Sequence, residues 1–144
     1  MPRKTIFFFM MIFILSLFIG QAEAQLKTIY KFKGVMVPLK MEHDNSVIKK
    51  GRYDIEFLKN QAAGSYIMRI LSGRKKLCTL VGEELTYDSH SGRQLTDPSI
   101  PDDPRLRMRK NADAQQIHFL FESGRKSPVY PYVYLRFKIG YLEE

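Results

Sequence analysis

The sequence predicts an all-β fold: a single antiparallel β-sandwich or partly open barrel of about seven strands, following an N-terminal signal peptide helix. Apolar and polar residues alternate with a period of two in four separate segments of the chain. Clusters of Gly, Asn, Asp and Ser separate the segments, as expected for turns between strands. Beyond residue 24 we find no convincing helix, although residues 97–100 or 111–115 could form a single turn.

The first 24 residues have the organisation of a cleaved secretory signal. Arg3 and Lys4 precede an apolar run over residues 6–19, and Ala22 and Ala24 follow in a small-x-small arrangement. A transmembrane anchor is the alternative, but a bilayer needs about 20 apolar residues and this run is shorter. We therefore expect cleavage after Ala24, no transmembrane segment thereafter, and a periplasmic or secreted protein.

Seven strands are expected in the remaining chain, at about residues 28–40, 52–59, 65–72, 75–87, 105–111, 116–122 and 131–142. Alternation over four of them predicts one buried and one solvated face for each strand. The side chains expected to face the core are Tyr53, Ile55, Phe57, Leu106, Met108, Ile117, Phe119, Phe121, Val133, Leu135, Phe137 and Ile139.

Two irregular features are expected in this pattern. Phe32 and Val35 fall on opposite parities within the first strand, and Gly34 between them predicts a bulge or bend. Pro38 places that end of the strand at a sheet edge or a bulge. Residues 88–104 contain three of the seven prolines and predict a long loop that crosses between sheets.

Residues 25–144 suit one domain with one core. Cys78 is the only cysteine, so no intramolecular disulfide can form and the core alone must stabilise the fold. The thiol lies in the apolar run "KKLCTLVG", where a cysteine is most often a small buried hydrophobe.

The chain is basic, with a formal net charge of +8. Loss of the signal peptide, which removes Arg3, Lys4 and Glu23, would leave the mature chain about one charge less basic. Such a balance keeps a small domain soluble and also favours anionic partners, such as acidic glycans, envelope polymers or lipid headgroups. Nucleic acid is not expected, because the signal peptide directs the chain out of the cytoplasm.

No residues with catalytic, metal-binding or cofactor-binding spacing are found, so no enzyme, metal or cofactor is predicted. His43, His90 and His118 are scattered, and His118 has the parity of a solvent-facing strand residue. Asp102 and Asp103 lie between two prolines and are expected to form a solvated turn. Nucleophile elbows and glycine-rich phosphate loops are absent from the sequence.

One strand face combines cations with aromatic side chains. If the last three strands form a meander, the solvated faces of residues 105–111 and 131–142 lie on the same side of the sheet, flanking the strand that bears His118 and Glu122. Cations beside tyrosines can pair with anions while the rings stack on sugars or bases. The candidate anion-binding face therefore comprises Arg105, Arg107, Arg109, Tyr132, Tyr134, Arg136 and Lys138. Ordinary surface chemistry is the alternative explanation, because tyrosine favours strands.

Three stretches resemble small secreted β-domains from acidobacteria and similar environmental bacteria: residues 35–58, 101–111 and 127–140. In the first, Gly51 and Tyr53 match the pattern of that group, whereas Lys49 and Lys50 replace its usual Pro-Ala pair. The resemblance implies a secreted β-sandwich or barrel-like domain. It implies no catalytic residues.

The leading hypothesis is a non-enzymatic, periplasmic or secreted binding module for an anionic polymer or lipid headgroup. A barrel that carries a small apolar ligand is the first alternative, although such barrels commonly use about eight strands. A hydrolytic enzyme that gathers His90, Asp102 and Asp103 is a less favoured alternative. A subunit whose edge strands pair with a partner is the last, and the oligomeric state stays open.

Overall fold

The computed structural model describes residues 25–85, 100–126 and 133–143. These residues form nine strands and no helix, so the all-β prediction is confirmed. Every strand pairing is antiparallel. The strands are β1 (Leu26–Val37), β2 (Lys40–His43), β3 (Ser46–Ile48), β4 (Gly51–Asn60), β5 (Tyr66–Ser72), β6 (Lys75–Glu84), β7 (Arg105–Asn111), β8 (Gln116–Glu122) and β9 (Tyr134–Leu142).

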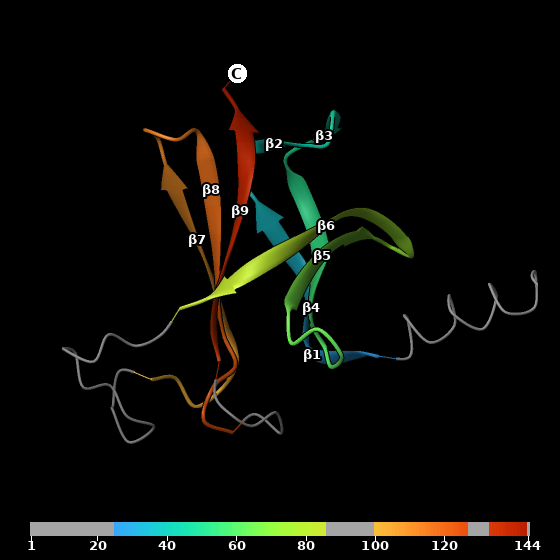
Figure 1. The fold of residues 1–144 in the computed structure, drawn as a ribbon. Coiled ribbons are helices and arrows are strands. Elements are labelled where there is room, and N and C mark those ends of the chain that lie inside the picture. The colour runs from blue at the N-terminus through green and yellow to red at the C-terminus, as the bar shows by residue number, and fades with distance from the viewer. Residues whose placement is uncertain (1–24, 86–99, 127–132, 144) are drawn as a thin grey trace, which may run out of the picture.

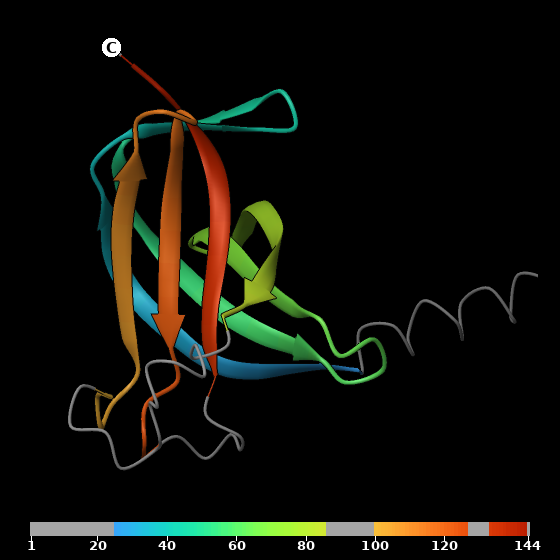
Figure 2. The same cartoon turned by 60° about the vertical axis from the view of Figure 1, so that its left-hand side comes forward.

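The strands belong to one strongly coiled open sheet that is not closed into a barrel (Figures 1 and 2). Strands β1, β4, β5 and β6 pair in that order, and β7, β8 and β9 form the predicted meander. Strand β9 joins the two groups, since it pairs with β8 along one edge and with β6 and β2 along the other. The sheet therefore curls around a single core, and the partly open barrel describes it better than a sandwich.

The structure has two strands more than the seven predicted, because residues 40–48, which apart from Lys40 lie beyond the first predicted strand, form the short strands β2 and β3. Pro38 lacks a backbone donor and ends β1 at Val37, and the chain restarts as β2 against the end of β9. Asp44 and Asn45 then adopt positive φ angles of 49° and 62° in a two-residue turn, which starts the short β3.

The bulge predicted at Gly34 is confirmed. The β1–β4 register shifts between Phe32 and Val35, and Gly34 has a φ of +62°. Its N–H donates to Oδ1 of Asp54 at 3.0 Å. The one extra residue on β1 switches the parity of the strand, so that Phe32 and Val35 both face the core.

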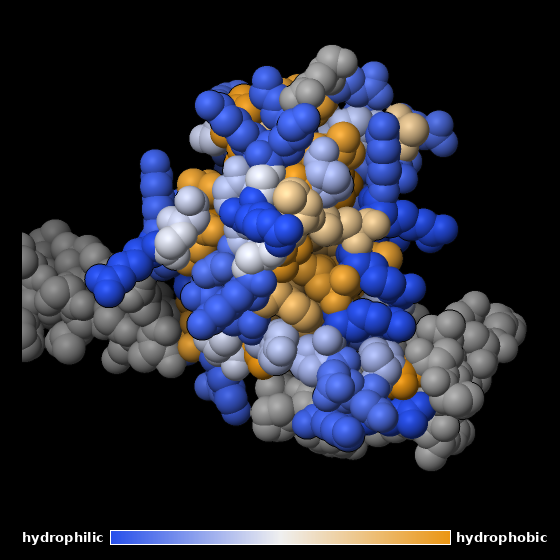
Figure 3. Space-filling view, turned by 180° about the vertical axis from the view of Figure 1, so that it is seen from behind, coloured by the Kyte–Doolittle hydropathy of each residue, from blue (hydrophilic) through white to orange (hydrophobic). Residues whose placement is uncertain are grey.

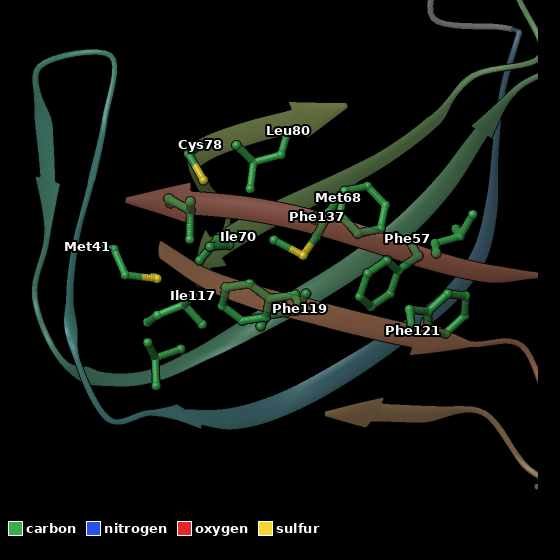
Figure 4. Close-up of a cluster of buried hydrophobic side chains, with 14 of the residues drawn as sticks. Met41, Phe57, Met68, Ile70, Cys78, Leu80, Ile117, Phe119, Phe121 and Phe137 are labelled. Carbon is green, nitrogen blue, oxygen red and sulfur yellow. The ribbon is translucent and has the colours of Figure 1, made fainter. Parts of the chain in front are cut away.

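The core lies between the two groups of strands, and its largest fully buried side chains are Phe57, Phe119, Phe121 and Phe137 (Figure 4). Phe57 and Phe121 stack across it with ring centroids 4.1 Å apart and an interplanar angle of 8°. Phe137 tilts against Phe57 at 5.5 Å. All three side chains are completely buried, and rings of this size give a disulfide-free domain most of its hydrophobic stabilisation.

The inward parity predicted from the sequence holds along β4, β8 and β9. Ile55, Ile117 and Ile139 are buried, whereas Tyr53, Leu106 and Met108 are only partly buried at the margin of the core. Burial of Cys78 is confirmed as well. This burial raises the pKa of its thiol to about 11.

Gly82 lets β6 approach β9 closely. Its position faces the core, and a Cβ there would lie 2.4 Å from Cε1 of Phe137. The ring of Phe137 thus occupies the space that any other residue at position 82 would need.

Several sequence-based expectations lie outside the described residues. They are the signal peptide and its cleavage site, most of the 88–104 loop, and position Tyr132. Among the described residues there is no helix long and apolar enough to cross a membrane.

Candidate functional site

The meander register brings six of the seven predicted site residues onto one outer face. Arg105, Arg107 and Arg109 of β7 lie opposite Glu122, Leu120 and His118 of β8. The same three β8 residues lie opposite Tyr134, Arg136 and Lys138 of β9. The basic face, as we call these nine residues, therefore consists of three rows that cross three strands. Tyr132, the seventh predicted residue, lies outside the described residues.

A buried carboxylate neutralises one corner of the basic face. Glu122 is only 1% exposed, and its Oε2 accepts a hydrogen bond from Nε of Arg105 at 2.7 Å. Nη2 of Arg105 also contacts this oxygen, and Nη2 of Arg107 lies 4.0 Å from it. Arg105 is therefore committed to an internal ion pair and contributes little to any external anion.

A second carboxylate reaches the face from β6. Oε1 of Glu83 lies 2.5 Å from Nη2 of Arg136 and 3.5 Å from Nζ of Lys138. The hydrogen bond from Arg136 holds the pKa of Glu83 below its usual value, with smaller contributions from the charges of Arg136 and Lys138. The sequence analysis missed this residue, because the β6–β9 pairing that brings it here joins segments about 50 residues apart.

Arg107 and Arg109 are left as the cations that face solvent most openly. Among the described residues Arg109 has no acidic partner, and Arg107 reaches Glu122 only at 4.0 Å. Nη2 of Arg107 lies 3.4 Å from the hydroxyl of Tyr134. Of the five cations expected on this face from the sequence, only Arg107 and Arg109, both on β7, are thus without a close carboxylate among the described residues.

A shallow open depression of about 460 Å³ lies at this centre. It is lined by Arg107, Met108, Arg109, Leu120 and Tyr134. Leu120 is 9% exposed, because it sits between Arg107 and Arg136 in the middle row. The depression therefore combines an apolar floor, two guanidinium groups and one phenol, which suits an anionic group carried on a partly apolar or sugar backbone.

A second depression of about 250 Å³ lies on the β6 side of the face. It is lined by Val81, Gly82, Glu83, Arg136 and Lys138, and Val81 is 72% exposed. Because Glu83 supplies negative charge here, this depression is less favourable for an anion than the one beside β7.

His118 lies in the row between Arg109 and Lys138, on the outer face of β8 as predicted. Its side chain is nevertheless only partly exposed to solvent. Burial lowers the pKa of His118, and the nearby charges of Arg136, Lys138 and Arg109 lower it further against the opposing effect of Glu83. Its Nε2 is buried and has no hydrogen-bond partner among the described residues. The imidazole is therefore neutral near pH 7 and adds no charge to the face.

The described residues contain no cluster of three or more His, Cys, Asp or Glu side chains that could hold a metal. His43 pairs with Asp44, at 3.2 Å between Nε2 and Oδ2. Asp102 and Asp103 are exposed, and Asp102 lies 3.8 Å from Arg125. His90, the third member of the enzymatic alternative, lies outside the described residues.

The chain matches no family model, no curated protein and no solved structure. The resemblance to secreted acidobacterial domains stays a prediction, and the function has to be argued from the residues of the basic face themselves.

Proposed function

We propose that this protein is a non-enzymatic binding module of the envelope or the secreted space, and that it holds an anionic polymer on its basic face. The observation that supports this most directly is the pair Arg107 and Arg109, which line an open depression. Arg107 reaches Glu122 only at 4.0 Å, and Arg109 has no acidic partner among the described residues. The location outside the cytoplasm rests on the signal peptide predicted at residues 1–24.

The arrangement of the cations favours a polymer over a single small anion. Arg107 and Arg109 lie two residues apart on one strand, which corresponds to about 7 Å between successive outward side chains. Arg136 and Lys138 lie two strands away, a further 10 Å or so across the sheet. Charges spread in this way meet the repeated anionic groups of a chain better than one headgroup.

The binding chemistry would be that of an ordinary polyanion site. Guanidinium groups pair bidentately with phosphate, sulfate or carboxylate, and the phenol of Tyr134 can donate to the same oxygens. Each neutralised anionic group releases condensed counterions, so affinity should fall steeply with salt. The alternative of an apolar-ligand carrier has less support, since Phe57, Phe121 and Phe137 fill the described interior.

The test compares two charge-matched double variants. Arg107→Gln with Arg109→Gln removes two charges from the face, and Lys75→Gln with Lys76→Gln removes two exposed charges from the start of β6. Binding to heparin and to long-chain polyphosphate is measured as a function of salt for both variants and the parent protein. We expect the arginine variant to lose roughly tenfold or more in affinity and about two units of salt slope, and the lysine variant to lose little.

Equal losses in the two variants would show that net charge alone drives binding and would overturn the proposal. Vesicles of anionic lipid and free inorganic phosphate serve as further arms of the experiment. Stronger binding to vesicles than to either polymer would assign the face to lipid headgroups instead. Thermal unfolding of each variant confirms that the fold is retained.

A further inference from the structure

The two end strands of the sheet, β1 and β7, are not paired with each other in the described part of the chain. Seven strands follow one another in the order β1, β4, β5, β6, β9, β8 and β7, through six antiparallel pairings. After six reversals of direction β1 and β7 run the same way, as the blue arrow and the golden-brown arrow at the bottom of Figure 4 show. The two edges therefore cannot join by continuing the antiparallel ladder, whereas one added strand could pair antiparallel with both.

The edges of the sheet face each other across a seam at which the core reaches the surface. The ring centroids of Phe32 on β1 and Phe121 on β8 are 6.1 Å apart. Phe121 lies opposite Leu106 of β7 in the β7–β8 ladder. The inward side chains along the seam, Phe32, Val35, Leu106 and Met108, pack on the core but are only partly buried. Figure 3 shows apolar side chains at the surface in the middle of this side of the molecule, bordered by polar ones.

Cations border the seam on its outer side. Arg107 and Arg109 are exposed on β7, and Lys31 of β1 is 39% exposed in its side chain. Asp54 lies 3.9 Å from Lys31 and balances part of its charge. A strand placed in the seam would have its inward side chains against partly buried apolar residues and its outward side chains between Lys31 of β1 and the two arginines of β7.

We propose that the seam between β1 and β7 receives an extended acidic segment of a partner protein, which adds as one strand antiparallel to both edges. The apolar residues of the segment would alternate with Asp or Glu. Main-chain hydrogen bonds to two edges would supply affinity, and the alternating pattern would supply specificity. The closed ring, which leaves out β2 and β3, would have eight strands, the number at which side chains alone fill a closed barrel. This inference rests on the strand order, and it shares Arg107 and Arg109 with the polymer proposal.

The probe is a fluorescent ten-residue peptide of alternating glutamate and valine. Two controls keep its composition and charge: a block peptide of five glutamates followed by five valines, and the alternating peptide with N-methyl groups on alternate residues. Binding is measured by fluorescence anisotropy, and the contact site by hydrogen–deuterium exchange. We expect the alternating peptide to bind at least tenfold more tightly than either control and to protect amides of β1 and β7 together.

A seam variant separates this site from the basic face. Val35→Gln places a polar side chain in the seam on β1, away from the rows of the basic face, so it should weaken the alternating peptide and leave polyphosphate binding unchanged. Equal binding of the three peptides, or protection absent from β1, would overturn the proposal. Concentration-dependent protection of the same amides without peptide would also overturn it, because the occupant would then be a second copy of the chain.

Discussion

Arg105 and Glu122 form an ion pair across the β7–β8 ladder in which the carboxylate is buried and the guanidinium is 40% exposed. The two partners therefore depend on each other unequally. If Glu122 were replaced, the exposed guanidinium of Arg105 could be solvated by water. If Arg105 were replaced, the carboxylate of Glu122 would stay buried and lose its closest cation. This inequality gives a stability prediction that does not depend on any ligand.

Replacing Arg105 by Met should destabilise the protein by roughly 2 kcal/mol, because a hydrogen bond to a buried charge is lost. Arg109→Met serves as the matched control, since Arg109 lies on the same strand face without an acidic partner among the described residues, and its cost should stay below about 0.5 kcal/mol. Chemical denaturation of both variants measures the difference. Similar values for the two would contradict the internal role of Arg105.

Removing the charge of Glu83 should strengthen polyanion binding. Glu83→Gln releases Arg136 and Lys138 from their shared acidic partner, so binding to polyphosphate should increase several-fold and the salt slope should steepen by about one unit. Glu84→Gln is the control, because it makes the same change in net charge one residue further along β6, without an ion pair among the described residues. If both variants gain equally, the effect is one of overall charge.

Gly82→Ala should disturb the core at its closest backbone approach. The new Cβ would lie 2.4 Å from the Phe137 ring, and displacing a completely buried ring should cost about 1–3 kcal/mol. A smaller side chain at position 137 should relieve the clash with the new Cβ at position 82. The double variant with Phe137→Leu should therefore lose clearly less stability than the sum of the two single variants, as measured by a double-mutant cycle.

His118 should make stability depend on pH below neutrality. Its pKa is lowered in the folded protein by burial first and then by Arg136 and Lys138, so the unfolded chain takes up the proton first as the pH falls through about 6.5. This contribution is present above that pH and is lost as the pH falls towards the folded pKa. Denaturation of the parent and of His118→Gln between pH 7.5 and 5 measures it, and the variant should have the shallower slope. Identical slopes would show that His118 is not responsible.

Cys78 should be unreactive in the folded protein. Its pKa of about 11 leaves little thiolate at neutral pH, and the side chain is buried. An aromatic disulfide reagent should therefore modify Cys78 immediately in denaturant and only at the rate of transient opening in native buffer. Rapid stoichiometric modification of the native protein would show that the thiol is accessible.

The local features of the fold could be predicted from the sequence because each depends on residues that are close together in the chain. The alternation at Ile117, Phe119 and Phe121 fixes the inner face of β8, and Gly34 marks the bulge at which β1 changes parity. The β7–β8 hairpin follows from its short connection at residues 112–115, and the alternation along each strand indicates which side chains share a face, which is why the rows of the basic face could be anticipated.

The remaining features depend on pairings between distant segments. No local pattern indicates that Glu83 lies beside Arg136, or that residues 40–42 return to the end of β9. The net charge of the basic face could not be predicted for the same reason, since one of its two neutralising carboxylates comes from a strand outside the meander. Pro38 indicates an irregularity at the end of β1, but no local pattern predicts that the chain continues as a separate strand, β2, from Lys40.

The position of β9 also has a consequence for the order in which the protein assembles. This strand is the last in the chain, yet β2, β6 and β8 all pair with it. The early strands can form hairpins while the chain is still being synthesised. The side chains of Phe57 and Met68 stay partly exposed to solvent until β9 pairs and Phe137 packs into the same core. Folding that waits for such distant contacts is slow and exposes apolar surface to other chains. A chain that ends before Tyr134 should therefore aggregate, because it lacks all of β9.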